Sequence, residues 1–159
     1  MFRSANVPPG YRPNVGMMLI GPDRRVFVGQ RLDTRMDAWQ MPQGGIDRGE
    51  TPERAALREL AEEIGTAKAE LLRMSADWFA YDLPTELART MWKCRYRGQA
   101  QKWAALRFTG VDDDIRLDTA HPEFRSWRWA RASELPSLIV PFKRDVYSAV
   151  VREFADLVD

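Results

Sequence analysis

The sequence has very little of the side-chain chemistry used in thiol and imidazole catalysis. Among its 159 residues there is one cysteine, Cys94, which excludes an internal disulfide, and one histidine, His121. Cys94 has no histidine nearby in the sequence, so we expect a buried strand residue rather than a nucleophile. His121 precedes a proline in a predicted loop, and we do not expect it to act as a catalyst.

Longer features are missing as well. No apolar run approaches the length of a membrane span, and the first residues lack the apolar core of a signal peptide. We therefore expect a cytoplasmic location and no membrane partner. The absence of a Gly-x4-Gly-Lys-Ser/Thr loop argues against a P-loop nucleotidase. Without repeats, low-complexity tracts or linkers, the chain is predicted to form one domain over residues 1–159.

Acidic residues are absent from one stretch of a chain whose net charge is only +1. Between Leu87 and Val111 all charged residues are basic, and aromatic residues are interleaved with them. The basic residues are Arg89, Lys93, Arg95, Arg97, Lys102 and Arg107. Such a stretch suits a polyphosphate or nucleic-acid ligand. A solvated edge strand protected by lysine and arginine is an equally good interpretation.

A short helix with clear start and stop signals is predicted over residues 51–64. Thr51 suits the N-cap, Pro52 falls at the first helical position, and Gly65 suits the C-terminal cap. Apolar residues recur at spacings of three and four, which predicts a stripe that packs on the core. These residues are Leu57, Leu60, Ala61 and Ile64.

The same helix carries three carboxylates, Glu59, Glu62 and Glu63, at spacings that place them within one turn of each other. Taken alone, such residues are typical of a solvated helix face. Three like charges repel each other unless a cation lies among them, and carboxylate oxygens are ligands of hard divalent ions such as Mg²⁺. The cluster therefore predicts a metal site and directs attention to a phosphate substrate.

The remaining pattern alternates strands with helices. A strand over Met91–Arg97 is predicted because basic and other side chains alternate there, which would give it a basic face of Lys93, Arg95 and Arg97. A turn is expected at residues 98–101, and an amphipathic helix over Phe142–Leu157. The other predicted extended segments are Asn14–Gly21, Arg25–Arg31, Trp39–Pro42, Ala69–Tyr81, Lys102–Thr109 and Phe124–Ala130. Together they favour an α/β/α sandwich around a mixed β-sheet.

The helix and its glycine-rich entry resemble the Nudix box, G-x5-E-x7-R-E-U-x-E-E-x-G-U, in which U is a bulky aliphatic residue. Its fixed positions are occupied here by Gly44, Glu50, Arg58, Glu59, Leu60, Glu62, Glu63 and Gly65. Thr66 occupies the last U position, which serves packing rather than chemistry. The resemblance covers nearly the whole chain and implies the Nudix-type α/β/α sandwich.

Flanking segments are similar to one branch of Nudix hydrolases, the bacterial RNA pyrophosphohydrolases and the related dinucleoside polyphosphate hydrolases. These segments are Tyr11-Arg12-Pro13-Asn14-Val15-Gly16, Trp39-Gln40-Met41-Pro42-Gln43, Gly98-Gln99-Ala100-Gln101-Lys102-Trp103, Glu123-Phe124 and Val140-Pro141-Phe142-Lys143-Arg144. The resemblance implies hydrolysis of phosphoanhydride bonds in 5′-triphosphate RNA, in diadenosine polyphosphates, or in both.

The resemblance also implies roles for individual residues in metal binding. Glu59, Glu62 and Glu63, helped by the Gly44 carbonyl, would hold Mg²⁺, for which Mn²⁺ could substitute. Glu123 would be a further ligand or a base from across the cleft. Glu59, Glu63 and Glu123 are all candidates for the general base, and the sequence does not choose among them. Glu50 and Arg58 would form a structural bridge, although Arg58 is also spaced to reach Glu62.

The substrate residues implied in the same way lie outside the box. Arg12 and Lys102 would contact phosphates, Phe142 would stack on a base beside Val140, and Tyr81 is a further candidate. Read from the residues alone, Arg12 could be a surface arginine, Lys102 could lie along a neighbouring tryptophan, and Phe142 could belong to the core.

Three functions follow, in order of preference. The first is removal of pyrophosphate from 5′-triphosphate RNA, and the second is hydrolysis of a dinucleoside polyphosphate such as diadenosine tetraphosphate. The third is a nucleotide- or RNA-binding module without catalysis. A nucleotide polyphosphate or RNA partner is expected in each case, and DNA is not.

Overall fold

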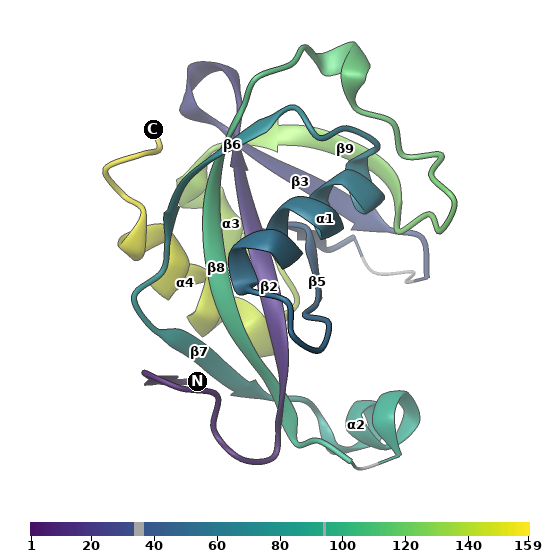
Figure 1. Cartoon of the computed structure of the whole chain (residues 1–159), viewed down its shortest axis with the longest axis vertical. Helices are drawn as coiled ribbons and strands as arrows, with labels where there is room; N and C mark the ends of the chain where they lie inside the picture. Colours follow the sequence, from purple (N-terminus) through teal and green to yellow (C-terminus); the bar gives the residue numbers. More distant parts are fainter. Residues whose placement is uncertain (34–36, 94) are drawn as a thin grey trace.

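The computed structural model describes residues 1–33, 37–93 and 95–159 (Figure 1). Nine strands are present in these ranges: β1 Phe2–Ser4, β2 Tyr11–Ile20, β3 Val26–Arg31, β4 Trp39–Gln40, β5 Gln43–Gly45, β6 Ala69–Met74, β7 Trp78–Asp82, β8 Gly98–Phe108 and β9 Phe124–Ala130. The α-helices are α1 Pro52–Ile64, α2 Thr85–Trp92, α3 Leu135–Leu138 and α4 Arg144–Glu153. Short 3-10 turns lie at η1 Pro22–Arg24, η2 Asp112–Asp114, η3 Ala132–Glu134 and η4 Pro141–Lys143.

The sheet is mixed and is organised around two long central strands. β2 and β8 run parallel and are paired from Tyr11–Gly98 to Ile20–Arg107, whereas every other pair of described strands is antiparallel. The order is β1-β7-β8-β2-β3-β4, with β5 beside β2, β6 beside β8 and β9 beside β3. Since β5 pairs with the first half of β2, the glycine-rich loop is fixed to the most central strand of the molecule.

Helices cover both faces of this sheet (Figure 1). On one face α1 buries Leu60 and Ile64 against a cluster that includes Phe27. On the other face α4 buries Val146 and Val150 in a second cluster. The predicted α/β/α sandwich around a mixed sheet is therefore confirmed.

The local signals of α1 are confirmed, but the predicted core stripe is partly wrong. The Thr51 hydroxyl accepts from the Arg54 amide at 3.3 Å, and Gly65 caps the end of the helix at φ 73°. Leu57, however, is 39% exposed. The helix buries Ala55, Ala56, Leu60, Glu63 and Ile64 instead, because its docking turns Glu63 toward the sheet and Leu57 toward solvent.

The predicted strand over Met91–Arg97 is wrong. Residues 85–92 form α2, and Lys93 caps it in the left-handed conformation at φ 52°, with its amide bonded to the Ala88 and Arg89 carbonyls. Helix formers around the buried Ala88 outweigh the alternation of basic residues that suggested a strand. The prediction for Cys94 concerns a residue outside the described ranges.

The predicted turn at residues 98–101 is also wrong. This segment begins β8, where Ala100 pairs with Ala80 on one side and with Pro13 on the other. Pairing on both sides satisfies the backbone better than a turn would. The predicted strand over Phe124–Ala130 is confirmed as β9, and the helix expected over Phe142–Leu157 is shorter, because η4 precedes α4.

The structure also bears on membrane insertion. In the described part of the chain, none of the helices combines the length and apolar character needed to cross a bilayer. The cytoplasmic location stays a prediction.

Candidate active site

The glycine loop approaches α1 closely at Gly44. A Cβ atom on Gly44 would lie 2.1 Å from the Glu59 Cδ atom, so any larger residue there would force the Glu59 side chain to move. Gly44 itself is held in place by pairing with Val15 of β2. The glycine therefore lets the backbone of β5 lie against the carboxylate of Glu59, and the central strand fixes this approach.

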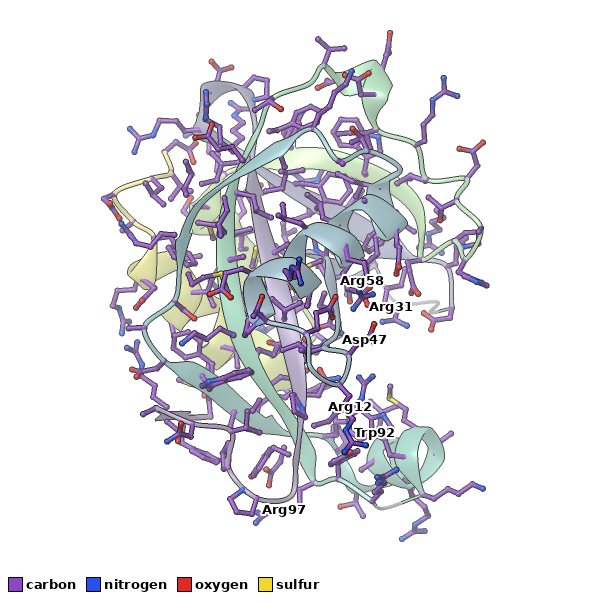
Figure 2. All side chains as sticks on the ribbon, viewed as in Figure 1. Arg12, Arg31, Asp47, Arg58, Trp92 and Arg97 are labelled. Atoms are coloured by element: carbon purple, nitrogen blue, oxygen red, sulfur yellow. The ribbon has the colours of Figure 1, made fainter. Side chains whose placement is uncertain are left out.

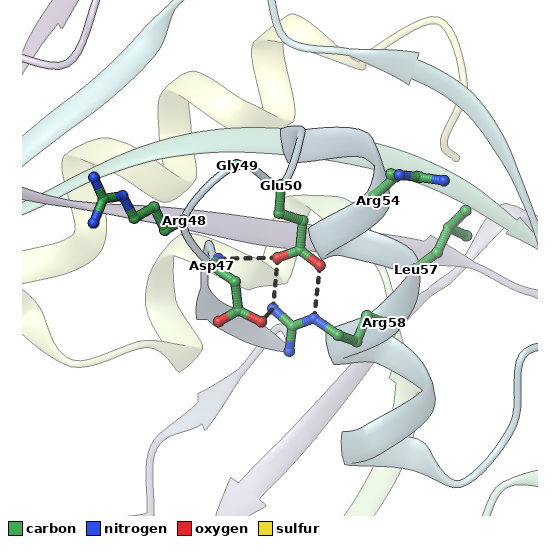
Figure 3. Close-up of a pocket in the computed structure, with 7 residues that line it drawn as sticks. All are labelled: Asp47, Arg48, Gly49, Glu50, Arg54, Leu57 and Arg58. Carbon is green, nitrogen blue, oxygen red and sulfur yellow. Dashed lines mark hydrogen bonds and ion pairs between the residues drawn. The ribbon is translucent and has the colours of Figure 1, made fainter.

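Arg58 joins the loop to the helix, and Figure 3 shows its two bonds to Glu50. Its Nε and Nη2 atoms each donate to a Glu50 oxygen at 2.8 Å, and Nη2 also donates to the Gly45 carbonyl at 3.0 Å. Nη1 donates to Glu59 at 2.9 Å and more distantly to Glu62 at 3.4 Å. Of the two partners left open by the sequence, Glu50 is therefore bound at the shorter distance and with two bonds.

This pairing controls the charge state of Glu50. The hydrogen bonds from Arg58, and next the one from the Asp47 amide, lower the pKa of Glu50 to about 2. The bridge forms one wall of an open basin of about 560 Å³, whose other lining residues include Arg48, Arg54 and Leu57 (Figure 3). Glu59 and Glu63 are not among the described residues that line this basin.

A second cavity, of about 270 Å³, gathers the acidic residues predicted from the sequence. Glu59, Glu62 and Glu63 line it from α1, and Glu123 lines it from the segment before β9. His121 lies at the same cavity. The Glu123 carbonyl accepts from the Leu32 amide at 3.0 Å, which ties this segment to the end of β3.

Glu63 is the unusual member of this group. Glu63 is only 7% exposed, and its Oε2 atom is buried with no hydrogen-bond partner among the residues that the structure describes. Burial raises the pKa of Glu63 well above its ordinary value, and the charges of Glu123 and Glu59 raise it further. Burial also raises the pKa of Glu59.

The donor set of this cavity fits a divalent cation. A cation beside the unpartnered Glu63 oxygen would offset both its desolvation and its repulsion by Glu59 and Glu123. Within residues 1–33, 37–93 and 95–159, no three acidic, histidine or cysteine side chains are already arranged as a ligand cluster. Glu59 and Glu62, which line the cavity, also contact Arg58.

The predicted substrate residues are divided between two places. Arg12 lies next to the loop, since a Cβ on Gly45 would be 2.6 Å from its Nη2 atom. Phe142 is half-buried, with its ring centroid 6.2 Å from that of Tyr81. Val140 packs on the α4 side of the core. Lys102 points elsewhere, because its Nζ atom donates to the Ala76 carbonyl at 3.0 Å.

Tyr81 is buried beneath the site and is not accessible for direct contact with a substrate. It is 2% exposed, and its hydroxyl donates to Gln99 Oε1 at 2.7 Å. Burial raises the pKa of the Tyr81 phenol, so it stays protonated. In this position its ring packs against Phe142 and Lys143.

Sequence analysis missed Lys143, which is the cation most deeply enclosed near the site. The residue is 8% exposed, and its Nζ atom lies 3.3 Å from Gln43 Oε1 and 5.7 Å from the centre of the Tyr81 ring. Desolvation, and next the nearby charge of Arg31, lower the pKa of Lys143 to about 8. Its place directly after Phe142 was the only signal in the sequence.

Arg31 at the end of β3 was missed as well. Its Nε atom donates to Asp33 at 2.7 Å, and its pKa is raised mainly by this bond. Glu123 and Glu63 contribute to the same shift through their charges, which places Arg31 near the acidic cavity. An arginine that ends an apolar strand was the available signal.

Comparisons with known proteins agree with this geometry. The model of the NUDIX domain matches residues 10–150. An RNA pyrophosphohydrolase of Rickettsia bellii is 52% identical over 148 residues, which are 93% of this chain and 92% of the relative. An RNA pyrophosphohydrolase of Rickettsia canadensis is 53% identical over the same length and with the same coverage.

Solved structures show the same fold at low sequence identity. The E. coli dihydroneopterin triphosphate pyrophosphohydrolase has a TM-score of 0.61 at 21% identity, covering 89% of this chain and 97% of that one. A C. elegans Ap4A hydrolase has a TM-score of 0.62 at 15% identity, covering 92% and 97%. The glycine loop, the Arg58 bridge and the family match over residues 10–150 lead to one conclusion: the chain belongs to the Nudix domain family of hydrolases.

Proposed function

We propose that this chain is a metal-dependent pyrophosphohydrolase that removes pyrophosphate from the 5′-triphosphate end of RNA, with residues 1–159 acting as one domain. The names of the Rickettsia relatives, at 52% and 53% identity, support the substrate. The observation that carries the chemistry is the buried, unpartnered Oε2 atom of Glu63 beside Glu59 and Glu123. The products would be RNA with a 5′-monophosphate and free pyrophosphate.

The residues that would hold the cation are the carboxylates of the acidic cavity together with the Gly44 carbonyl. They are Glu59, Glu62, Glu63 and Glu123. Bound Mg²⁺ or Mn²⁺ would neutralise phosphate charge and lower the pKa of a water. Glu59, Glu63 and Glu123 all line the cavity, and each is a candidate to accept the proton of that water.

Cations of the chain surround the other side of the site and suit a polyphosphate. Arg12 lies beside Gly45, Lys143 beside Gln43, and Arg31 near Glu63 and Glu123. Fixed positive groups of this kind stabilise the charge that develops on phosphoryl oxygens. The ring of Phe142, supported by Tyr81 and with Val140 nearby in sequence, suits stacking on the first base.

A paired turnover assay tests this proposal. Purified protein with Mg²⁺ is given 5′-triphosphate RNA of several nucleotides and, separately, diadenosine tetraphosphate, and the products are separated by chromatography. We expect faster turnover per site on RNA. A clear preference for the dinucleotide would replace the proposed substrate, and equal inactivity of wild type and Glu63→Gln on both compounds would favour a binding module.

A further inference from the structure

A continuous line of neighbouring groups leads from the acidic cavity to α2. Glu59 lies against Gly44, the next residue, Gly45, lies against Arg12, and the Arg12 guanidinium lies 5.9 Å from the centre of the Trp92 ring. Figure 2 shows Arg12 and Trp92 pointing toward one another where α2 approaches the sheet. A chain bound at the acidic cavity can therefore continue past Arg12 onto α2.

The surface at the end of this line is strongly basic. Arg89, Lys93 and Arg95 are all exposed, and none of them forms an ion pair with any residue that the structure describes. Arg97, by contrast, is paired with Asp82 at 3.1 Å. No acidic residue occurs from Leu87 to Val111. The carboxylate of Glu86, in the first turn of α2, forms no ion pair with any residue that the structure describes.

The basic surface is held in a defined position. The Leu83 amide donates to the Arg97 carbonyl at 3.0 Å, and the Arg97 amide donates to the Gly10 carbonyl at 2.9 Å, which closes the α2 segment at its base. Ala88 is buried in the α4-side core, and Trp92 packs edge-on to Tyr96 at 5.8 Å. Arg89 therefore projects from an anchored helix and Lys93 from its C-terminal cap, and the Arg95 amide donates to the Trp92 carbonyl at 2.9 Å.

We propose that α2 and its cap form a binding surface for the RNA chain downstream of the 5′ end. In this arrangement Arg89, Lys93 and Arg95 contact backbone phosphates of single-stranded RNA, and the Arg12–Trp92 pair separates this surface from the acidic cavity. The proposal rests on the proposed RNA substrate and extends it from the reacting end to the body of the chain. Unpaired cations along a groove are the usual means of binding a single strand without reading its sequence.

The experiment compares 5′-triphosphate RNAs of two, four and eight nucleotides. The variant Arg89→Gln/Lys93→Gly/Arg95→Gln removes three charges, and glycine suits position 93 because Lys93 already has φ 52°. We expect KM for the eight-nucleotide RNA to rise at least tenfold, since each exposed charge pair contributes up to about fivefold. KM for the dinucleotide and kcat for all three RNAs should stay within about twofold.

Two controls separate this effect from a general loss of charge or of folding. Arg152→Gln removes an exposed cation from α4 and should leave the length dependence unchanged. The single variants Arg89→Lys and Arg95→Lys keep the charge and should behave as wild type. Thermal melting of each variant reports whether α2 still folds.

Salt dependence gives a second readout. The slope of log KM against log salt for the longest RNA should become shallower by about 0.7 for each phosphate that the variant no longer neutralises. Unchanged KM and slope in the triple variant would overturn the proposal. An equal rise of KM for all lengths would also overturn it, because the cations would then serve the triphosphate.

A binding measurement keeps this inference distinct from the proposed activity. Glu63→Gln, with and without the three α2 changes, is titrated with fluorescent eight-nucleotide 5′-triphosphate RNA, and anisotropy is recorded. If wild type fails to hydrolyse any RNA, the proposed function is wrong, and tighter binding with α2 intact would still support the surface. Equal binding by both proteins would contradict the surface whatever the activity.

Discussion

Two carboxylates of one short segment differ in their hydrogen bonding and in the direction of their pKa shifts. Glu50 lies just before α1, and Glu63 lies near the end of the helix. Glu50 receives two bonds from Arg58 and one from the Asp47 amide, and its pKa falls to about 2. Glu63 is buried with an oxygen that has no partner, and its pKa rises well above the ordinary value. The first carboxylate is satisfied within the protein, whereas the second keeps one oxygen without a partner among the described residues.

Within one short motif, Glu50 therefore belongs to a structural bridge, whereas Glu63 belongs to the candidate active site. Arg58 holds the glycine loop against the helix with bonds that need no ligand. Glu63 keeps an unfavourable charge that a cation would relieve. Changes on the Arg58 side should therefore act mainly on stability, and changes on the Glu63 side mainly on turnover.

The largest effect is expected for Glu63→Gln. Loss of a metal ligand or base should lower kcat by between about 10²- and 10⁴-fold. Without divalent metal, the melting temperature should stay equal or rise, because glutamine removes a buried charge. Steady-state turnover and thermal melting measure the two effects. A large fall in melting temperature would contradict the prediction that Glu63 acts mainly on turnover.

Gly44→Ala should come next. The added methyl group collides with the Glu59 side chain and should displace it, which costs about 1–3 kcal/mol of stability and lowers turnover. Gly49→Ala is the matched control, since nothing lies within 4 Å of its Cβ position but its φ is 80°. That control should lose about 1 kcal/mol through backbone strain and keep kcat. Urea unfolding and turnover of both variants test this comparison.

Arg58→Lys tests the bridge between Arg58 and Glu50. Lysine keeps the charge but cannot donate through Nε and Nη2 to both Glu50 oxygens. The free energy of unfolding should fall by about 2 kcal/mol. Urea unfolding measures this loss, with Arg54→Lys as a control on the same helix. Unchanged stability would mean that the bridge does not hold the loop.

The smallest effect is expected in the pH dependence of the free energy of unfolding, to which Glu50 and Glu63 contribute with opposite signs. The lowered pKa of Glu50 stabilises the fold above its unfolded value of about 4.5, and this contribution disappears as pH falls from there toward about 2. The raised pKa of Glu63 acts in the other direction, so its contribution becomes less favourable as pH rises above about 4.5.

Unfolding of metal-free protein over this pH range tests the two signs. The stability difference between wild type and Glu50→Gln should shrink on acidification. The advantage of Glu63→Gln over wild type should instead grow as pH rises. Parallel pH profiles for all three proteins would contradict the assignment of the two carboxylates.

Features that depend on neighbouring residues in the sequence were predicted correctly, whereas features that depend on packing between elements were not. The ends of α1 were predicted because Thr51, Pro52 and Gly65 act within one turn of the chain. The exposure of Leu57 and the burial of Glu63 were not, because they depend on how the helix is rotated against the sheet. The basic strand predicted at residues 91–97 is wrong because α2, docked through Ala88 in the core, extends to Trp92 and is capped by Lys93.

By itself, the sequence determined the acidic residues and the glycine loop, since all lie within one short segment, but it left Arg58 with two possible partners, Glu50 and Glu62, until the structure showed the shorter bonds to Glu50. Only the tertiary structure decided that Arg31 and Lys143 lie beside that segment, and that Glu63 rather than Glu62 is buried. The physical reason is that desolvation and long-range pairing are properties of packed elements. They cannot be read from any one of those elements alone.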